Sequence, residues 1–379
     1  MISQIPGQRH VVVDFPRPDR QIVTLAPAIA ALPKEDVAPG LWMPVGVTPA
    51  GKGVALDLAT LPHILLAGAS GAGKTVAGQA AVLSLACRLS PDQLEIVIID
   101  PKAIDFSPFA SLPHLRGGRI VTEPEEAINV LGELTGPELA ERTRILQDAR
   151  CPNIRELRAR RPDLGVKHIV VAIDEYAELV TILPKTEREE FERQILRLAQ
   201  RARAVGIHMI IATQRPTTEF VTGAVKANLP TRISFRLPQR VDSTVIIDQA
   251  GAENLLGAGD MLLLHEGRLQ RLQGYFVSMD KIATLVTELA HQRREHEEAT
   301  SAHELFRVPQ GVQSTRAEGP QGVFRRRSGA KENRACGRAA QAHRSAGGRI
   351  LETSCDADAR WPGKHAGVPQ GRPADCHTP

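Results

Sequence analysis

A glycine-rich loop between a strand-sized apolar run and a helix-forming segment constrains this chain more than any other feature. Residues 64–67 are apolar on both faces of a strand, and residues 76–89 are alanine-rich with a helical pattern. The loop between them reads GASGAGKT, which satisfies the phosphate-binding spacing G-x-x-x-x-G-K-[ST] at every fixed position. This order predicts a phosphate site at the N-terminal end of the helix.

Each residue type in this loop has a chemical reason. We expect glycines to adopt left-handed backbone angles that turn N–H groups toward an anion; these are Gly68, Gly71 and Gly73. Lys74 would reach the β and γ phosphates, and the Thr75 hydroxyl would ligate Mg²⁺. The residues expected to bind the nucleotide are Gly68, Ala69, Ser70, Gly71, Ala72, Gly73, Lys74 and Thr75. The alternative, a chance glycine-rich turn, is disfavoured by the flanking strand and helix.

Strand-sized apolar runs alternate with helical patterns along the rest of the chain. The expected strands are 94–99, 168–173, 207–212 and 232–237. The expected helices are 125–149 with a kink or break at Gly136-Pro137, 187–205 and a last, charged helix at 281–298. A terminal hairpin is expected from residues 261–264 and 269–277. Strands apolar on both faces, separated by helices, predict an α/β fold with a parallel sheet covered on both sides.

Composition divides the chain into three expected parts. Residues 1–55 are rich in proline and carry short apolar runs at 11–13, 21–25 and 41–45, which predict a small β-rich subdomain or linker. Residues 56–300 hold the strand–helix alternation and would form the main domain. Residues 301–379 are rich in Gly, Ala, Arg, Pro and Gln without a hydrophobic period, which predicts a disordered tail.

Overall composition excludes some classes of protein. The net charge of +4 is only mildly basic, and the 379 residues include no apolar run near the ~20 residues that cross a bilayer. The N-terminal residues show no signal-peptide pattern. The five cysteines have no metal-like spacing. These features predict a cytoplasmic chain without a transmembrane segment or structural zinc.

A second acidic site is predicted where the third buried strand ends, at Ile173-Asp174-Glu175. The carboxyl ends of parallel strands meet at the ligand edge of a sheet, so both acids would face the phosphate loop. Asp174 would hold Mg²⁺ through water, and Glu175 would polarise an attacking water. The alternative is a helix N-cap. Gln214, which follows the fourth strand, would contact the γ phosphate and that water.

The chain resembles the FtsK/SpoIIIE family of double-stranded DNA translocases over about residues 5–280. The matching segments are IPG (5–7), GASGAGKT (68–75), IIDPK (98–102), LPHL (112–115), VVAIDEYAEL (170–179), RLAQRARAVGIHMIIATQRP (197–216), KANLPTRISF (226–235) and DQAGAENLLGAGDML (248–262). The phosphate loop occurs in many folds, whereas the combination of ATQRP, NLPTRISF and LLGAGDM is far more specific. The resemblance implies a RecA-like core that hydrolyses ATP with Mg²⁺ in a hexameric ring around duplex DNA.

The resemblance also implies roles for several arginines. Active sites in such rings lie between subunits, so an arginine finger must come from the neighbour. Arg203 matches the favoured position and Arg232 is second; for each, the alternative is a surface or helix-end arginine. The channel-lining candidates for DNA are Arg215, Arg236 and Arg240. They would contact phosphates, because a translocase must pass any sequence. Thr244 stands where the family often has a basic residue.

The chain departs from cell-division members of the family, which carry N-terminal membrane helices and a C-terminal winged helix. Neither is evident here, so we expect either a soluble motor recruited to the inner face of the membrane by an anchored partner, or a part of a longer system. Relatives that transfer duplex DNA by conjugation in actinobacteria look nearest, although chromosome segregation stays an alternative process.

Two other functional classes stay open. A protein-export motor of the type VII secretion kind shares the core, but such chains usually hold several modules. A non-enzymatic nucleotide switch is disfavoured, because the expected catalytic set is intact: Lys74, Thr75, Asp174, Glu175 and Gln214.

Overall fold

The computed structural model describes residues 2–4, 11–13, 21–33, 39–61, 63–305 and 350–353. The segment Ile5-Pro6-Gly7 and nearly all of the tail expected to be disordered lie outside these residues. Strands β1 (Ile2–Gln4) and β2 (Val11–Val13) pair antiparallel in a small sheet of their own. The strand expected at 11–13 is therefore confirmed.

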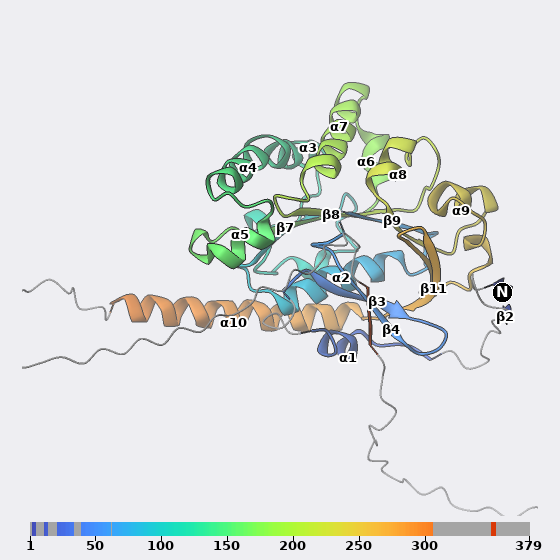
Figure 1. Ribbon diagram of the computed structural model, residues 1–379, viewed down its shortest axis with the longest axis horizontal. Coiled ribbons are helices and arrows are strands. Elements are labelled where there is room, and N and C mark those ends of the chain that lie inside the picture. Colours follow the sequence, from blue (N-terminus) through green and yellow to red (C-terminus); the bar gives the residue numbers. More distant parts are fainter. Residues whose placement is uncertain are drawn as a thin grey trace, which may run out of the picture.

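One large sheet organises the described residues (Figure 1). Its ten strands follow the order β12-β4-β3-β11-β10-β9-β5-β8-β7-β6 within that part of the chain. The strands from β9 to β6 are parallel, as expected, and β9 pairs antiparallel with β10, the first strand of the predicted hairpin. The bounds are β3 Trp42–Val47, β4 Gly53–Asp57, β5 His63–Ala67, β6 Leu94–Ile99, β7 His168–Ile173, β8 Ile207–Thr213, β9 Thr231–Phe235, β10 Asp260–His265, β11 Arg268–Gly274 and β12 Ile350–Thr353.

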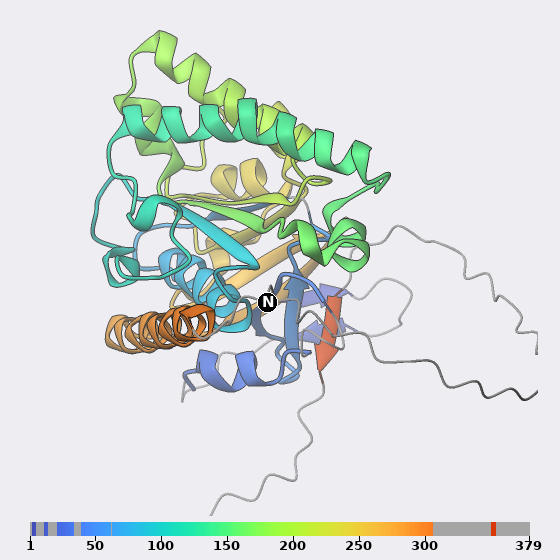
Figure 2. The ribbon, with the colours of Figure 1, turned by 90° about the vertical axis from the view of Figure 1, so that its left-hand side faces the viewer.

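Helices cover both faces of this sheet (Figure 2). In Figure 1, α3, α4, α6, α7 and α8 lie on one side, and α2, α1 and α10 lie on the other. The bounds are α1 Leu25–Ala30, α2 Lys74–Arg88, α3 Pro124–Glu133, α4 Leu139–Asp148, α5 Ile154–Arg160, α6 Tyr176–Ile182, α7 Lys185–Arg201, α8 Gly223–Asn228, α9 Arg240–Ile247 and α10 Met279–Leu305. Among the helices of the described ranges, none is long and apolar enough to cross a membrane.

The two-residue period of the strands builds two separate cores. On β5, Leu65 and Ala67 join the core beneath α3, α4 and α7, whereas Ile64 and Leu66 join the core beneath α2 and α10. The central strands β5, β7 and β8 are buried along their whole length. A sheet covered on both faces explains why these strands read as continuous apolar runs instead of alternating with polar residues.

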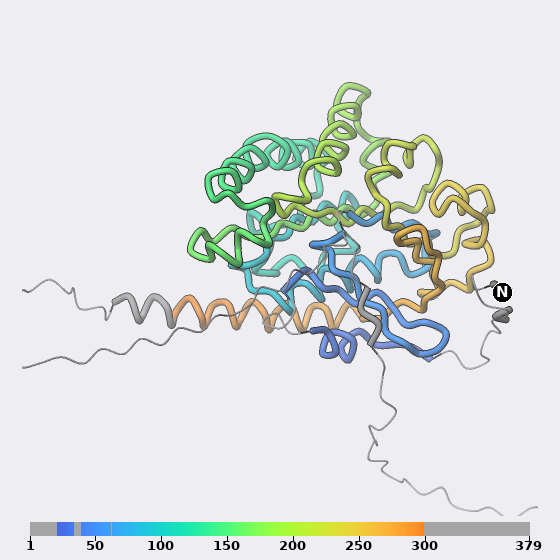
Figure 3. Tube along the Cα trace, viewed as in Figure 1, coloured from blue at the N-terminus to red at the C-terminus, as the bar shows by residue number. Residues whose placement is uncertain are grey.

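The N-terminal part differs from the expectation at two points. The run 21–25 is not a strand: α1 begins at Leu25, and Pro27 fits its first turn because proline needs no intrahelical N–H bond there. The boundary expected at residue 55 falls inside β4. Both β3 and β4 extend the main sheet. Strand β3 pairs with β11, which lies more than 200 residues later in the sequence (Figure 3).

The helical segment 125–149 stays continuous through its proline. A π-helical turn at Leu134–Glu138 contains Pro137 and joins α3 directly to α4. Proline has no N–H group to donate to the preceding turn of a helix. A π-helical turn contains one more residue than an α-helical turn, and this wider turn accommodates the proline without ending the helix. The kink expected at Gly136-Pro137 is thus a π-bulge.

Two buried histidines stand at the amino ends of the parallel strands. His63 opens β5 with no exposed surface, and His168 opens β7 with 7% exposed. Burial lowers the pKa of His63 to about 4 and the pKa of His168 to about 3. The nearby positive charges of Arg158 and Arg142 lower the pKa of His168 further. Both rings are therefore neutral in the folded protein.

We expect the stability of the fold to fall as the pH drops from 6.5 toward about 4. The unfolded histidines take up protons near pH 6.5, whereas the folded ones stay neutral, so acid favours the unfolded chain. Urea unfolding midpoints at pH 7 and pH 5 measure the difference. The variant His168→Asn should have a smaller difference in midpoint between pH 7 and pH 5. The variant His291→Asn, at an exposed histidine, is the control and should keep the wild-type difference. An equal difference in all three proteins contradicts the assignment.

Candidate functional site

The phosphate loop has the strained backbone that its motif predicts. It connects β5 to α2, and its glycines Gly71 and Gly73 have φ values of 72° and 112°. Gly73 directly precedes the first helical residue, Lys74, so free N–H groups of the helix start face the loop. The expected left-handed angles are confirmed at these two positions.

Gly68, the first glycine of the loop, does not have the expected backbone angle. The left-handed φ predicted for it is wrong, because Gly68 is absent from the positive-φ glycines of the described chain. A Cβ atom at this position would instead lie 2.6 Å from the Cβ of Phe235 on β9. Close approach of two neighbouring strand ends, not backbone angle, requires glycine here.

The loop is fastened to one later segment at two points. The backbone N–H of Ala69 donates to the carbonyl of Arg236 at 2.9 Å. The N–H of Gly259 donates to the carbonyl of Ala72, also at 2.9 Å. A Cβ on Gly73 would lie 2.8 Å from the Gly259 nitrogen, so this contact needs a bare backbone. We call residues 236–259 the loop clamp.

A buried ion pair joins the loop to the next acidic site. The Nζ atom of Lys74 lies 2.7 Å from Oδ1 of Asp174, and the two side chains are 3% and 1% exposed. The other carboxylate oxygen of Asp174 is buried and has no hydrogen-bond partner among the residues that the structure describes. An unsatisfied buried oxygen is costly, so this arrangement favours a further cationic or donor group at Asp174.

Asp105 is a site residue that the sequence reasoning missed. The Thr75 hydroxyl and Oδ2 of Asp105 are 3.5 Å apart. Burial, followed by the charge of Asp174, raises the pKa of Asp105. Asp100 folds this segment back on itself, because its carboxylate accepts from the N–H groups of Lys102 and Phe106. The proximity of Asp105 to the recognised Asp100-Pro101-Lys102 run is the signal that would have found it.

Glu175 occupies the predicted carboxyl edge in a strained conformation. Its φ is 55°, and its side chain is buried. Although it stands at the N-cap position of α6, its side chain makes no capping bond. Instead, Oε1 accepts from the Gln214 N–H at 3.0 Å and lies 3.3 Å from the Thr213 hydroxyl. The strand end of β8 therefore fixes the orientation of this carboxylate.

A cavity of about 350 Å³ opens beside these groups. The phosphate loop lines it together with Asp105 and Gln214. Ala258, Gly259, Gly274, Tyr275 and Phe276 line it as well. Its volume lies within the range of small-molecule sites. The structure thus brings together the loop, Thr75, Lys74 and Gln214 around one cavity, with Asp174 bonded to Lys74.

The two arginine-finger candidates lie away from this cavity. Arg203 is exposed in the turn before β8, which is the amino end of the parallel strands. Arg232 is 8% exposed, and its guanidinium binds the carbonyl of Ile246 at 2.7 Å and Asp248 at 2.8 Å. Neither reaches its own phosphate loop; their action on a neighbouring subunit stays a prediction.

The three arginines proposed to contact DNA are exposed. Arg215 directly follows Gln214, Arg236 begins the loop clamp, and Arg240 begins α9. Their backbone positions place them near the carboxyl edge or on the clamp. Contact with nucleic acid stays a prediction for all three.

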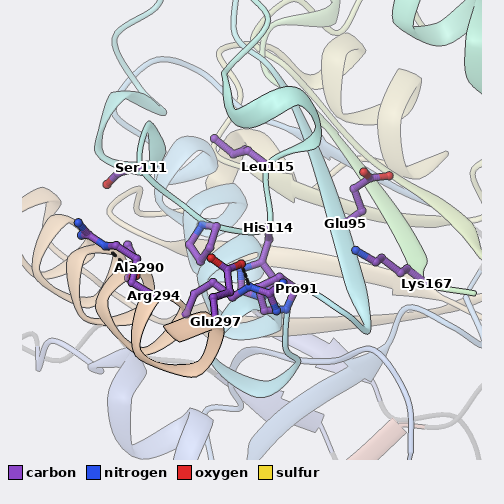
Figure 4. A pocket seen from close by; sticks show the side chains of 11 residues that line it. Pro91, Glu95, Ser111, His114, Leu115, Lys167, Ala290, Arg294 and Glu297 are labelled. Atoms are coloured by element: carbon purple, nitrogen blue, oxygen red, sulfur yellow. Dashed lines mark hydrogen bonds and ion pairs between the residues drawn. The ribbon is translucent and has the colours of Figure 1, made fainter. Parts of the chain in front are cut away.

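A second cavity of about 500 Å³ lies between α10 and the loop around His114 (Figure 4). Its charged residues are largely paired with each other or with neighbours. Arg293 binds Asp92 and Glu297, and Glu95 binds Arg116. None of the predicted site residues lines it. The cavity at the phosphate loop is therefore the candidate active site.

A RecA-like sheet with a phosphate loop on β5 and acidic residues after β7 defines a P-loop NTPase. Residues 30–218 match the FtsK/SpoIIIE family model, and the chain belongs to this family.

Two curated relatives illustrate the similarity to full-length proteins. The DNA translocase FtsK of Campylobacter jejuni is 38% identical over 296 residues, and that of Rhizobium meliloti is 36% identical over 324 residues. Each match covers 77% of this chain but only 31% and 36% of the relative. The chain thus spans about a third of the length of these relatives.

Solved structures share the fold. The pCW3 conjugation coupling protein TcpA, with ATPγS, superposes with a TM-score of 0.61 at 24% identity, covering 76% of this chain and 80% of that one. The second and third ATPases of EssC from Geobacillus thermodenitrificans also give 0.61, at 18% identity, covering 75% and 53%. At these identities the likeness establishes architecture alone.

We expect Gly68→Ala to destabilise the protein by about 1–3 kcal/mol, the usual cost of forcing an added methyl into a packed contact. The cause is the clash with Phe235, and the urea unfolding midpoint measures it. Gly223→Ala is the matched control, because an added Cβ there meets nothing within 4 Å. If both variants unfold at the wild-type midpoint, the close-approach explanation fails.

Proposed function

We propose that this chain is the motor of an ATP-driven double-stranded DNA translocase. The observation that carries the proposal is the Glu175 carboxylate, oriented by the end of β8 beside the Lys74–Asp174 pair. A fixed carboxylate next to a phosphate loop suits hydrolysis better than passive nucleotide storage. The family membership and the names of the curated relatives support DNA as the polymer that is moved.

Lys74 would exchange partners when ATP binds. In this structure its ammonium group donates to Asp174 at 2.7 Å. The β and γ phosphates offer a stronger anionic partner, so binding would release the Asp174 carboxylate. Glu175 would orient the attacking water, and the Gln214 side chain in the cavity would sense the γ phosphate.

Magnesium fits the oxygen groups beside the phosphate loop. The Thr75 hydroxyl and the carboxylates of Asp105 and Asp174 are hard oxygen donors. One Asp174 oxygen has no hydrogen-bond partner within the described part of the chain. Mg²⁺ is commonly held by one or two carboxylates together with substrate phosphates, so a complete protein cage is not required. The ion would neutralise charge on the phosphates. Within the described residues, no group of three or more His, Cys, Asp or Glu forms a metal site by itself.

A ring of identical subunits, six by family resemblance, would complete each site. The exposed Arg203 would reach the neighbour's phosphates, and Arg215, Arg236 and Arg240 would contact the DNA backbone. Recruitment by a membrane-anchored partner, and the choice between conjugative transfer and chromosome segregation, stay predictions. A type VII protein-export motor is the second candidate, but the curated relatives reported above are named DNA translocases.

Linear duplex DNA should stimulate ATP hydrolysis by the full chain. Glu175→Gln should lower the stimulated rate at least about 100-fold, the loss typical of a removed general base, while ATP binding persists. Glu178→Gln, one helical turn away and paired with Lys102, is the control and should keep most of the rate. A steady-state assay with and without DNA measures both. A wild-type ATPase rate that is the same with and without DNA argues against translocation.

Two inactive variants should complement each other if Arg203 acts on a neighbour. Glu175→Gln lacks the catalytic carboxylate, and Arg203→Ala lacks the finger. In a mixed ring, some interfaces combine an intact Glu175 with an intact Arg203, so DNA-stimulated hydrolysis should reappear on mixing. Arg232→Ala mixed with Glu175→Gln is the comparison. Recovery with Arg232→Ala but not with Arg203→Ala would reverse the assignment.

A further inference from the structure

The cavity at the phosphate loop is lined by an aromatic side chain that the proposed chemistry does not use. Phe276 is 45% exposed, a large fraction for a phenylalanine. Its neighbours differ: Tyr275 is half-buried against the core, and Val277 is buried. Aromatic residues make up only 3% of this chain, so an exposed one is unusual here. Contact of the apolar ring with water is unfavourable, and a ligand that covers the ring would remove this free-energy cost.

The backbone fixes the position of this ring. The N–H of Phe276 donates to the carbonyl of Val23 at 2.8 Å, and its carbonyl accepts from the N–H of Leu25 at 3.1 Å. Thr24 and Phe276 thereby form a parallel bridge. Because the main chain is held by both hydrogen bonds, the position from which the side chain starts is fixed before any ligand arrives. Such preorganisation reduces the entropy lost on binding.

Two glycines line the same cavity as the ring and the phosphate loop. Gly259 and Gly274 are joined by an N–H···O bond of 2.7 Å. Gly259 also contacts the loop through Ala72. One cavity is thus lined both by an anion-binding loop and by an exposed aromatic ring. A nucleoside triphosphate has the same two chemical parts.

We propose that Phe276 forms the base subsite of the nucleotide site, where its ring packs against the flat face of the purine. This inference rests on the proposed ATPase function and adds a residue that positions the base. Stacking on an aromatic side chain contributes substantially to the binding of a nucleobase and does not depend on hydrogen-bonding pattern. The phosphates would be held by the loop and the base by Phe276, within the same cavity.

Calorimetric binding of Mg-ATP and of Mg-tripolyphosphate to the full chain separates the contribution of Phe276 from that of the phosphate loop. Tripolyphosphate carries the phosphate chain without a base. Phe276→Ala should weaken ATP binding by about tenfold, within the usual range for a lost base-stacking contact, and should leave tripolyphosphate binding unchanged. Phe276→Trp keeps an aromatic face and should retain ATP affinity. Leu164→Ala, a similarly exposed residue outside the cavity at 41%, is the control and should change neither.

Other results overturn the inference in distinguishable ways. Wild-type ATP affinity in Phe276→Ala, with the wild type binding both ligands, removes the base subsite but leaves the phosphate site intact. Equal loss of both ligands in that variant means that Phe276 supports the fold of the cavity and does not contact the base. Failure of the wild type to bind either ligand overturns the proposed nucleotide site itself, and the base subsite with it.

Discussion

The buried ion pair between Lys74 and Asp174 is the interaction on which the rest of the site depends. It joins the first residue of α2 to the residue that follows β7, across 100 positions of sequence. Two charges in a low-dielectric interior are stable only as a pair, so neither can be lost without leaving the other unsatisfied. The pair therefore holds the phosphate loop against the acidic strand end until a stronger anion competes for the lysine.

The parallel part of the sheet explains why the chemistry gathers at one edge. The carboxyl ends of β5, β7 and β8 carry the phosphate loop, the acidic pair and Gln214, and adjacent pairing brings these ends together. The antiparallel strands beyond β9 have another role. The turn before β10 supplies Gly259, and the segment after β11 supplies Phe276, so the residues that flank the hairpin line the cavity.

Local patterns predicted much of this arrangement from sequence. The apolar runs identified β5 to β9, because a strand buried on both faces has an unmistakable composition. Lys74, Thr75, Asp174 and Gln214 followed from strand ends and motif spacing. Features that depend on distant partners were not predictable in this way. Gly68 is constrained by Phe235, which is remote in sequence, and Asp105 reaches the site only because Asp100 folds its loop.

The loop clamp has a mechanical consequence. Its two ends, Arg236 and Gly259, are hydrogen-bonded to the start and the end of the phosphate loop, and α9 lies between them. Chain and backbone hydrogen bonds together form a closed circuit. A shift of the loop must therefore either break one of these two hydrogen bonds or move the clamp with it. The phosphate loop is thus connected to the surface that carries Arg240 through main-chain atoms alone.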